Sequence, residues 1–202
     1  PPMSEPIDFY FDFTSPYGYF MSEKIDALAE RFGRKVRWHP LLLGVVFKSC
    51  GTEPAISVPL KRDYALHDFA RSARFLGVPY VQPERFPVPT QAAGRTYYWL
   101  HDQDCALARR FAHAAYRAFF QQGRDISAPE EVIAIAAGLG VDAGALTEAL
   151  KDEAVMDRLK TETEAAMARG VFGSPYVLID GEAFWGVDRL EQIERWLETG
   201  GF

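Results

Sequence analysis

The feature that most constrains this chain is a short aromatic segment that leads directly into a proline-containing helix start. Residues 7–13 are aromatic and alternating in character, which is typical of a buried strand. Thr14-Ser15-Pro16 follows, in which a hydroxyl side chain can cap a helix and the proline suits its first turn. Apolar residues then recur near the helical period until Gly33. The sequence therefore predicts Ser15 at a strand-to-helix turn, where unpaired backbone N–H groups and the helix dipole favour an anion.

Ser15 taken alone would be expected only to cap its helix, as most serines in this setting do. A second segment far along the chain changes that expectation, because Ser174-Pro175 directly precedes a β-rich run. Asp180-Gly181 then separates this run from another short one, which predicts a β-hairpin. A proline that enters a strand can follow a cis peptide bond, so Pro175 is a candidate cis-proline.

The chain between these two segments is predicted to be mostly helical. Residues 35–43 indicate a second strand, and the strand–helix–strand order predicts two parallel neighbouring strands. No strand is predicted over residues 60–169. We therefore expect an α/β domain of residues 1–50 and 170–202, interrupted by an all-helical insertion of residues 51–169.

The individual helices follow from periodicity and capping signals. Residues 44–59 look irregular. Capping residues are expected at Ser127 (in a capping box), Asp142 and Asp188. Helices are predicted over residues 60–76, 96–122, 129–138 and 154–169, with further helices that start at residues 142 and 188.

The composition excludes several classes of protein. A net charge of −6 over 202 residues, without a cluster of Lys and Arg, argues against a nucleic-acid-binding protein. No apolar run has membrane-spanning length and no export signal is visible, so a cytoplasmic location is expected. Cys50 and Cys105 form no Cys-x-x-Cys motif and are expected to be free thiols. No ligand spacing predicts a metal site.

The two constrained segments together resemble the thioredoxin superfamily. The segments are the aromatic strand into Ser15-Pro16-Tyr17-Gly18 and the late Gly173-Ser174-Pro175-Tyr176 before a hairpin. The resemblance spans residues 7–197 and is closest to the DsbA-like branch that holds the kappa-class glutathione transferases and the 2-hydroxychromene-2-carboxylate isomerases. It implies a thioredoxin-like domain with a large all-helical insertion, in which the turn at Ser15 faces the cis-proline loop. Residues 38–48 and 67–79 look most like the bacterial isomerases.

The resemblance assigns the chemistry to Ser15. Redox members of the superfamily keep a cysteine thiolate at this helix start, whereas here serine stands first and Gly18 stands where a second cysteine would be. The turn could therefore stabilise a thiolate that the protein does not supply, and the family implies glutathione as its source. Ser15 would donate a hydrogen bond to the sulfur, so we expect it to be catalytic rather than only a cap.

Other contacts to glutathione are implied by the same resemblance. Ser174 and Val177 match the cis-proline segment along which the family binds the peptide as an added strand. Asp188 and Arg189 match a segment that contacts its γ-glutamyl end. Lys61 matches a basic residue that reaches its glycine carboxylate.

Four further residues complete the expected site. Thr52 lies in a loop where the family often has asparagine, and threonine can still hydrogen-bond. Tyr17, His39 and Lys48 are candidates for contacts with the carboxylate or phenol of a small aromatic oxo-acid substrate.

Three functions are compatible with the sequence. The first is the glutathione-dependent conversion of 2-hydroxychromene-2-carboxylate to trans-o-hydroxybenzylidenepyruvate in bacterial naphthalene-type catabolism, by reversible thiolate addition. The second is glutathione conjugation or peroxide reduction, as in kappa-class transferases. The third is a binding or chaperone-like module in which Ser15 only caps the helix. A serine hydrolase is disfavoured because Ser15 does not lie in a Gly-x-Ser-x-Gly turn. Relatives are commonly homodimeric, so a homodimer is expected.

Overall fold

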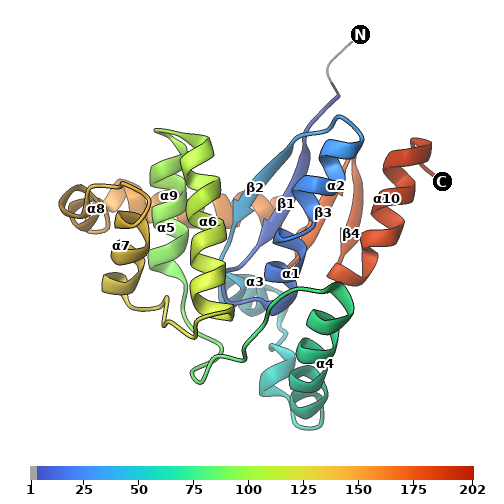
Figure 1. Ribbon diagram of the computed structural model, residues 1–202, viewed down its shortest axis with the longest axis horizontal. Helices are drawn as coiled ribbons and strands as arrows, with labels where there is room; N and C mark the ends of the chain where they lie inside the picture. Colours follow the sequence, from blue (N-terminus) through green and yellow to red (C-terminus); the bar gives the residue numbers. More distant parts are fainter. Residues whose placement is uncertain (1–3) are drawn as a thin grey trace.

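A computed structural model describes residues 4–202 and contains one four-stranded sheet flanked by helices (Figure 1). The strand order is β2-β1-β3-β4. The strands are β1 (Ile7–Phe11), β2 (Val36–Pro40), β3 (Tyr176–Ile179) and β4 (Glu182–Trp185). Within the described residues no strand lies between β2 and β3, which confirms the helical character predicted for that region. The fold is the predicted thioredoxin-like arrangement with a helical insertion.

Strand β1 brings the two ends of the chain together. It pairs in parallel with β2, so that Phe9 lies opposite Trp38, and antiparallel with β3, so that Phe9 also lies opposite Val177. The parallel pair and the β3–β4 hairpin are both confirmed. Asp180 and Gly181 have φ of 51° and 87°, the backbone of a tight hairpin turn that favours Asp-Gly.

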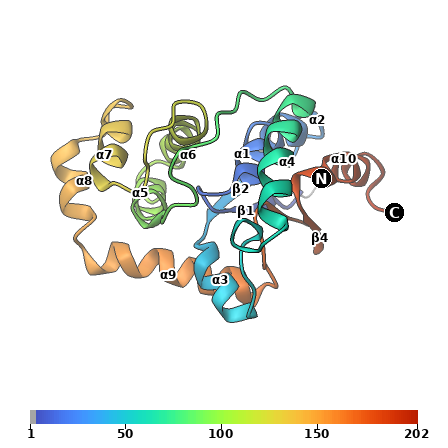
Figure 2. The same ribbon diagram turned by 90° about the horizontal axis from the view of Figure 1, so that it is seen from below.

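Helices cover the sheet and form the insertion. The α1 (Pro16–Ser22) and α2 (Ile25–Arg31) helices connect β1 to β2. Figures 1 and 2 show α5 to α8 grouped beyond β2, whereas α4 lies apart from them. The remaining elements are α3 (Leu43–Cys50), η1 (Ala55–Ser57), α4 (Lys61–Leu76), α5 (Gln91–His101), α6 (Cys105–Phe120), α7 (Pro129–Ala137), α8 (Ala143–Ala149), α9 (Glu153–Ala168), η2 (Val187–Arg189) and α10 (Leu190–Thr199).

Three predicted element boundaries are wrong. The first predicted helix is two helices, α1 and α2. The long pattern over residues 96–122 is also interrupted, because the Asp104 side chain accepts hydrogen bonds from the N–H groups of Ala106 and Leu107 and caps α6. Residues 44–59 are not all irregular, since they contain most of α3. In the first two cases a short polar connection was too brief to stand out against the apolar periodicity. In the third, Gly51, Pro54 and Pro59 mark only the segment that follows α3.

Two predicted caps are also wrong, and one is confirmed. Ser127 bonds to Asp125 rather than to the start of α7, where Ala128 is the N-cap residue. Asp188 lies within η2, and α10 begins only after Arg189. Asp142 does cap α8, because its side chain accepts from the Ala145 N–H.

The two faces of the sheet carry different side chains because strand residues alternate in direction. Phe9 and Phe11 belong to the main aromatic core together with Tyr116 of α6, and all three are 0% exposed. Tyr10 belongs to a smaller cluster on α3 and the end of α9. Asp8 also belongs to this second side of the strand. The main core therefore fixes β1 and α1, which carry the turn at Ser15.

The division into a sheet domain (residues 1–50 and 170–202) and a helical insertion (residues 51–169) stays a proposal. The insertion is not an isolated unit, because both α4 and α6 pack against α1 of the sheet domain. Among residues 4–202, none of the helices has the length and apolar character needed to cross a membrane.

Candidate active site

Ser15 stands at the start of α1 and is held by two hydrogen bonds. Its Oγ accepts from the Gly18 N–H over 3.0 Å, so the residue is the N-cap. The same hydroxyl donates to the Ser174 carbonyl over 3.1 Å. Ser15 is only 6% exposed. The hydroxyl proton therefore already points away from α1 and towards the facing loop, from where it could turn to a bound sulfur.

The facing loop contains the Ser174-Pro175 bond, which is cis. The Asp12 N–H donates to Ser174 Oγ over 3.1 Å, and the Gly186 N–H donates to the Pro175 carbonyl over 3.0 Å. The loop is thereby fixed both to the end of β1 and to the end of the β3–β4 hairpin. The predicted opposition of the Ser15 turn and the cis-proline loop is present.

Gly18 leaves no room for a second reactive side chain in the turn. A Cβ built at this position would lie 2.6 Å from the Tyr116 hydroxyl and 2.8 Å from Ser174 Oγ. Both atoms are themselves engaged, since the Tyr116 hydroxyl donates to the Asp12 carbonyl and Ser174 Oγ accepts from the Asp12 N–H. Any side chain at position 18, including that of a cysteine, would therefore require these two hydroxyl groups to move.

Asp12 is a polar group of the site that sequence reasoning missed. It is 3% exposed and lines the cavity beside Ser15. One carboxylate oxygen accepts from the Thr14 N–H over 3.0 Å and the Thr90 hydroxyl over 2.6 Å, and the other accepts from the Leu43 N–H over 2.8 Å. Burial raises the pKa of this carboxyl, and the three donors oppose the rise. The sequence signal for this role was a charged residue placed between the aromatic residues Phe11 and Phe13.

A cavity of about 1250 Å³ opens beside the turn. Ligand sites commonly have volumes of about 300–1,000 Å³, so this cavity has room for a tripeptide and a second small molecule. Among residues 4–202, its lining includes two lysines, Lys48 and Lys61, and one carboxylate, Asp12. Its walls are mainly apolar, and they come from α3, η1, α4, the loop before α5 and the cis-proline loop. Apolar walls with two ammonium groups favour aromatic and anionic ligands.

Most of the predicted site residues meet at this cavity. The lining residues include Ser15, Tyr17, Lys48, Thr52, Lys61 and Ser174. These six residues come from α1, α3, the following loop, α4 and the segment before β3. Tyr17 differs from the others because its hydroxyl is already engaged by the Asp68 carboxylate.

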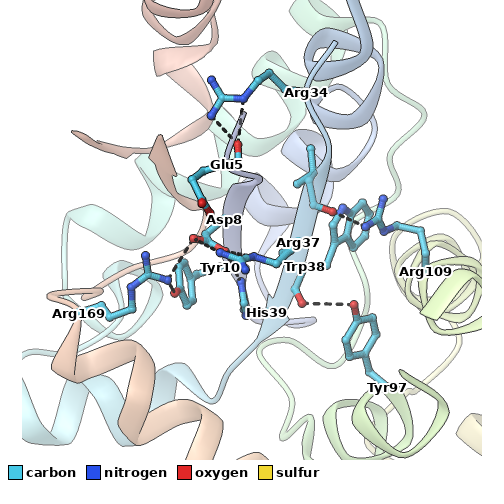
Figure 3. A network of polar contacts seen from close by, with 11 residues as sticks. Glu5, Asp8, Tyr10, Arg34, Arg37, Trp38, His39, Tyr97, Arg109 and Arg169 are labelled. Atoms are coloured by element: carbon cyan, nitrogen blue, oxygen red, sulfur yellow. Dashed lines mark hydrogen bonds and ion pairs between the residues drawn. The ribbon is translucent and has the colours of Figure 1, made fainter. Parts of the chain in front are cut away.

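Neither His39 nor Val177 is among the residues that line the cavity. Figure 3 shows His39 beside Asp8 and Tyr10. The His39 Nε2 lies 2.8 Å from an Asp8 oxygen, and its ring stacks on Tyr10 with a centroid separation of 4.5 Å. Val177 is 0% exposed and pairs with strands on both sides, so its backbone cannot accept an added peptide strand. Strand alternation and the central place of β3 explain these two differences from the sequence expectation.

Asp188 and Arg189 lie close to the site but outside the cavity lining. A Cβ at Gly186 would lie 2.4 Å from an Asp188 carboxylate oxygen, and the Gly186 N–H binds the cis-proline loop. Asp188 is therefore next to that loop. Arg189 lines a separate cavity of about 390 Å³ between β4 and α10, which shares Trp185 with the main one.

Aromatic residues at the cavity mouth were not predicted. Phe172 and Trp185 pack edge to face with a centroid separation of 5.0 Å, and they are 44% and 57% exposed. The indole of Trp185 lies against Gly173, where a Cβ would come within 2.3 Å of Nε1. Phe86 lines the cavity from the other side, before a second cis-proline, Pro87. The glycine directly before Ser174 was the one sequence signal for this close approach.

Comparisons with known proteins agree with this fold. A model of the DSBA-like thioredoxin domain matches residues 6–198. A 2-hydroxychromene-2-carboxylate isomerase from Sphingobium xenophagum is 32% identical over 198 residues, covering 96% of this chain and 99% of the relative. Glutathione S-transferase kappa 1 from Caenorhabditis elegans is 27% identical over 199 residues, covering 93% of this chain and 88% of the relative. A solved structure of 2-hydroxychromene-2-carboxylate isomerase has a TM-score of 0.86 and 28% identity, covering 96% of this chain and 95% of that one.

Proposed function

This chain belongs to the DSBA-like thioredoxin family, and we propose that it is a glutathione-dependent isomerase that converts 2-hydroxychromene-2-carboxylate to trans-o-hydroxybenzylidenepyruvate in bacterial naphthalene-type catabolism. Relatives named as isomerases match nearly its whole length, so the chain is an enzyme of the isomerase type. The thiol, the substrate and the residues that act on them are the parts that we propose.

The observation that carries the proposal is a thiolate-type turn without a cysteine. Ser15 occupies the start of α1, and the packing around Gly18 excludes a second thiol. Cys50 and Cys105 are free and exposed, and neither lines the cavity. A turn of this kind can act on sulfur only if a ligand brings it.

The polar groups around the cavity fit glutathione. Lys61, at the start of α4, would bind the glycine carboxylate, and Thr52 would donate a hydrogen bond nearby. The backbone at Ser174 would bind the peptide in the manner of an added strand. Asp188, beside the cis-proline loop, would bind the γ-glutamyl ammonium.

When bound, glutathione would supply a thiolate that adds reversibly to the conjugated double bond of the opened substrate, permits rotation and leaves unchanged. Ser15 would turn its hydroxyl proton from the Ser174 carbonyl to the sulfur, while its Oγ keeps the bond from the Gly18 N–H. Lys48 would hold the substrate carboxylate. The apolar walls would hold the aromatic ring and exclude water.

The second candidate is a kappa-class-like transferase or peroxidase that acts on another electrophile. Near full-length similarity to kappa-class enzymes supports it. The two candidates differ in stoichiometry, because an isomerase consumes no glutathione. A thiol-consumption assay with each class of substrate separates them.

The experiment that tests the proposal compares the parent protein with Ser15→Ala in calorimetry with glutathione and in turnover of the chromene substrate. The parent should bind glutathione, and the variant should lose about 100-fold in kcat, as is typical when one donor to a reactive anion is removed. Ser22→Ala is a matched control, because Ser22 lies on the same helix and, within residues 4–202, its hydroxyl bonds to the Tyr19 carbonyl alone. Absence of binding at millimolar glutathione, or an unchanged rate in Ser15→Ala, would contradict the proposal.

We further propose that the protein is a cytoplasmic homodimer, as the sequence analysis expects. Sedimentation velocity of the purified protein tests the dimer. Fractionation of the source cells tests the location.

A further inference from the structure

Helix α4 forms one wall of the cavity yet is weakly anchored to the rest of the protein. Its main packing partners are α1 and the short η1 (Figure 2). It buries only Ala65, Phe69 and Ala73, whereas α6, of the same length, buries eight residues. Proline-containing loops flank α4 on both sides. Its position relative to the turn at Ser15 therefore depends on few contacts.

Tyr17 of α1 makes the main contacts to α4. Its ring packs edge to face on Phe69 with a centroid separation of 5.1 Å, and its hydroxyl donates to the Asp68 carboxylate. Burial raises the pKa of Tyr17, and the bond to Asp68 raises it further, so the phenol keeps its proton. The polar contact therefore joins a neutral donor to a charged acceptor, which is stronger than a neutral pair.

Asp68 is itself held in place by its own helix. The Arg71 guanidinium donates to it over 2.6 and 3.1 Å, and the Ser72 hydroxyl donates over 3.2 Å. Burial alone would raise the pKa of Asp68, but these bonds and the one from Tyr17 hold it below its usual range. Arg71 also donates to the Tyr64 hydroxyl, and Tyr64 lines the cavity. Asp68 thus joins the turn at Ser15 to the cavity wall.

Lys61 lies on the same side of α4 as Asp68. The two residues are seven positions apart, which is two helical turns or about 10 Å along the axis. Tyr17 follows Ser15 after a single residue. The Tyr17–Asp68 bond therefore links the helix that follows Ser15 to the helix that carries Lys61.

We propose that Asp68 is a positioning residue that, through Tyr17, fixes Lys61 at the correct distance from Ser15 for one thiol peptide to reach both. The Tyr17 hydroxyl then serves α4 rather than the substrate. This inference rests on the proposed function for its ligand, but the docking of α4 can be measured without any ligand.

The first experiment measures amide hydrogen exchange in Tyr17→Phe, Asp68→Asn and the double variant. Tyr17→Phe keeps the ring on Phe69, so the fold should be retained. Exchange over residues 61–76 should be about tenfold faster in each variant, because a hydrogen bond to a charged group is lost. Exchange in the double variant should be no faster than in either single variant, and the exchange rates of α6 should be unchanged. Asp63→Asn is the matched control, since Asp63 is exposed on α4 and forms no bond or ion pair within residues 4–202.

The second experiment compares glutathione with its analogue amidated at the glycine carboxylate. The parent should bind glutathione about tenfold more tightly than the amide, because Lys61 pairs with the carboxylate. In Tyr17→Phe and Asp68→Asn this preference should disappear, and in Asp68→Asn kcat at saturating glutathione should stay within about twofold of the parent. If Tyr17 and Asp68 had a structural role unrelated to Lys61, the variants would bind glutathione and its amide more weakly by the same factor.

Two results would overturn the inference. Unchanged exchange over residues 61–76 in both single variants would show that Tyr17 and Asp68 do not anchor α4. A preference for the free carboxylate that persists in the variants would show that Lys61 does not depend on them. Failure of the parent to bind glutathione would instead contradict the proposed function, and the exchange experiment would still decide whether Asp68 anchors α4.

Discussion

Asp8 on β1 and Asp12 just after its end are both buried, but their carboxyl groups have partners of opposite kinds. Asp8 and Asp12 are each 3% exposed. Asp8 is surrounded by the cationic side chains of Arg37 and Arg169 and by His39 (Figure 3), whereas Asp12 accepts only from neutral donors. Burial raises the pKa of both carboxyls. At Asp8 the bonds and charges of His39 and Arg37 outweigh burial and lower the pKa, but at Asp12 the pKa stays raised.

The charged partners of Asp8 hold its pKa below the ordinary value, whereas at Asp12 the effect of burial prevails over three neutral donors. Asp8 and its partners Arg37, His39 and Arg169 do not line the cavity. Asp12 lies at the cavity, where its carboxyl joins the neighbouring segments through the three hydrogen bonds that it accepts.

The largest effect is expected for Asp12→Ala. Removal of the carboxyl leaves the N–H groups of Thr14 and Leu43 and the Thr90 hydroxyl without their acceptor in a buried place. The free energy of unfolding should fall by about 3–5 kcal/mol, measured by urea denaturation. A loss below about 1 kcal/mol would show that water reaches these donors.

A smaller effect is expected for Asp8→Ala, although Asp8 has the charged partners. The side chains of Arg37 and Arg169 are 54% and 47% exposed, so they can return to water when the carboxylate is removed. The loss should be about 1–3 kcal/mol in the same urea assay. A loss larger than that of Asp12→Ala would reverse the comparison.

The pH dependence of the two asparagine variants should run in opposite directions. The pKa of Asp8 is lowered from its ordinary 3.8, so its contribution exists above that pH and is lost as pH falls through the folded value. The pKa of Asp12 is raised from 3.8, so its contribution exists below that pH and is lost as pH rises through the folded value. Relative to the parent, the deficit of Asp8→Asn should shrink towards low pH and that of Asp12→Asn towards neutral pH. Unfolding curves between pH 2 and 7 measure both, and parallel pH profiles would contradict the assignment.

Salt should produce the smallest difference. At about 1 M salt the screening length falls to about 3 Å, which weakens the partly exposed pairs around Asp8. The penalty of Asp8→Ala should shrink by about 0.5 kcal/mol, and that of Asp12→Ala should not change. Sodium chloride titrations of both variants measure this, with the parent as the reference.

Much of the fold could be predicted because its signals are local. The Asp-Gly turn, the proline after Ser174 and the hydroxyl before Pro16 each act within a few residues. The limits of α5 and α6 were missed because a short break capped by Asp104 leaves the apolar period on either side intact.

Site residues that depend on local signals were predicted, and those that depend on contacts between distant segments were not. Ser15 and Lys61 stand at helix starts that the sequence shows, and both line the cavity. His39 was assigned to the substrate, but its Nε2 lies 2.8 Å from an oxygen of Asp8 on the adjacent strand, and it does not line the cavity. Nothing near Asp12 in the sequence names Thr90 or Leu43 as its partners, so its role could not be inferred.

The sequence by itself determined the family, the sheet and the serine at the strand-to-helix turn, because capping, turn geometry and strand alternation are properties of neighbouring residues. Only the tertiary structure decided what that serine faces. Ser15 and Ser174 are 159 positions apart, and Tyr17 and Asp68 are 51 apart. Contacts over such separations depend on how the core orients β1, α1 and α4. The relative orientation of these elements does not follow from the local pattern of residues in the sequence.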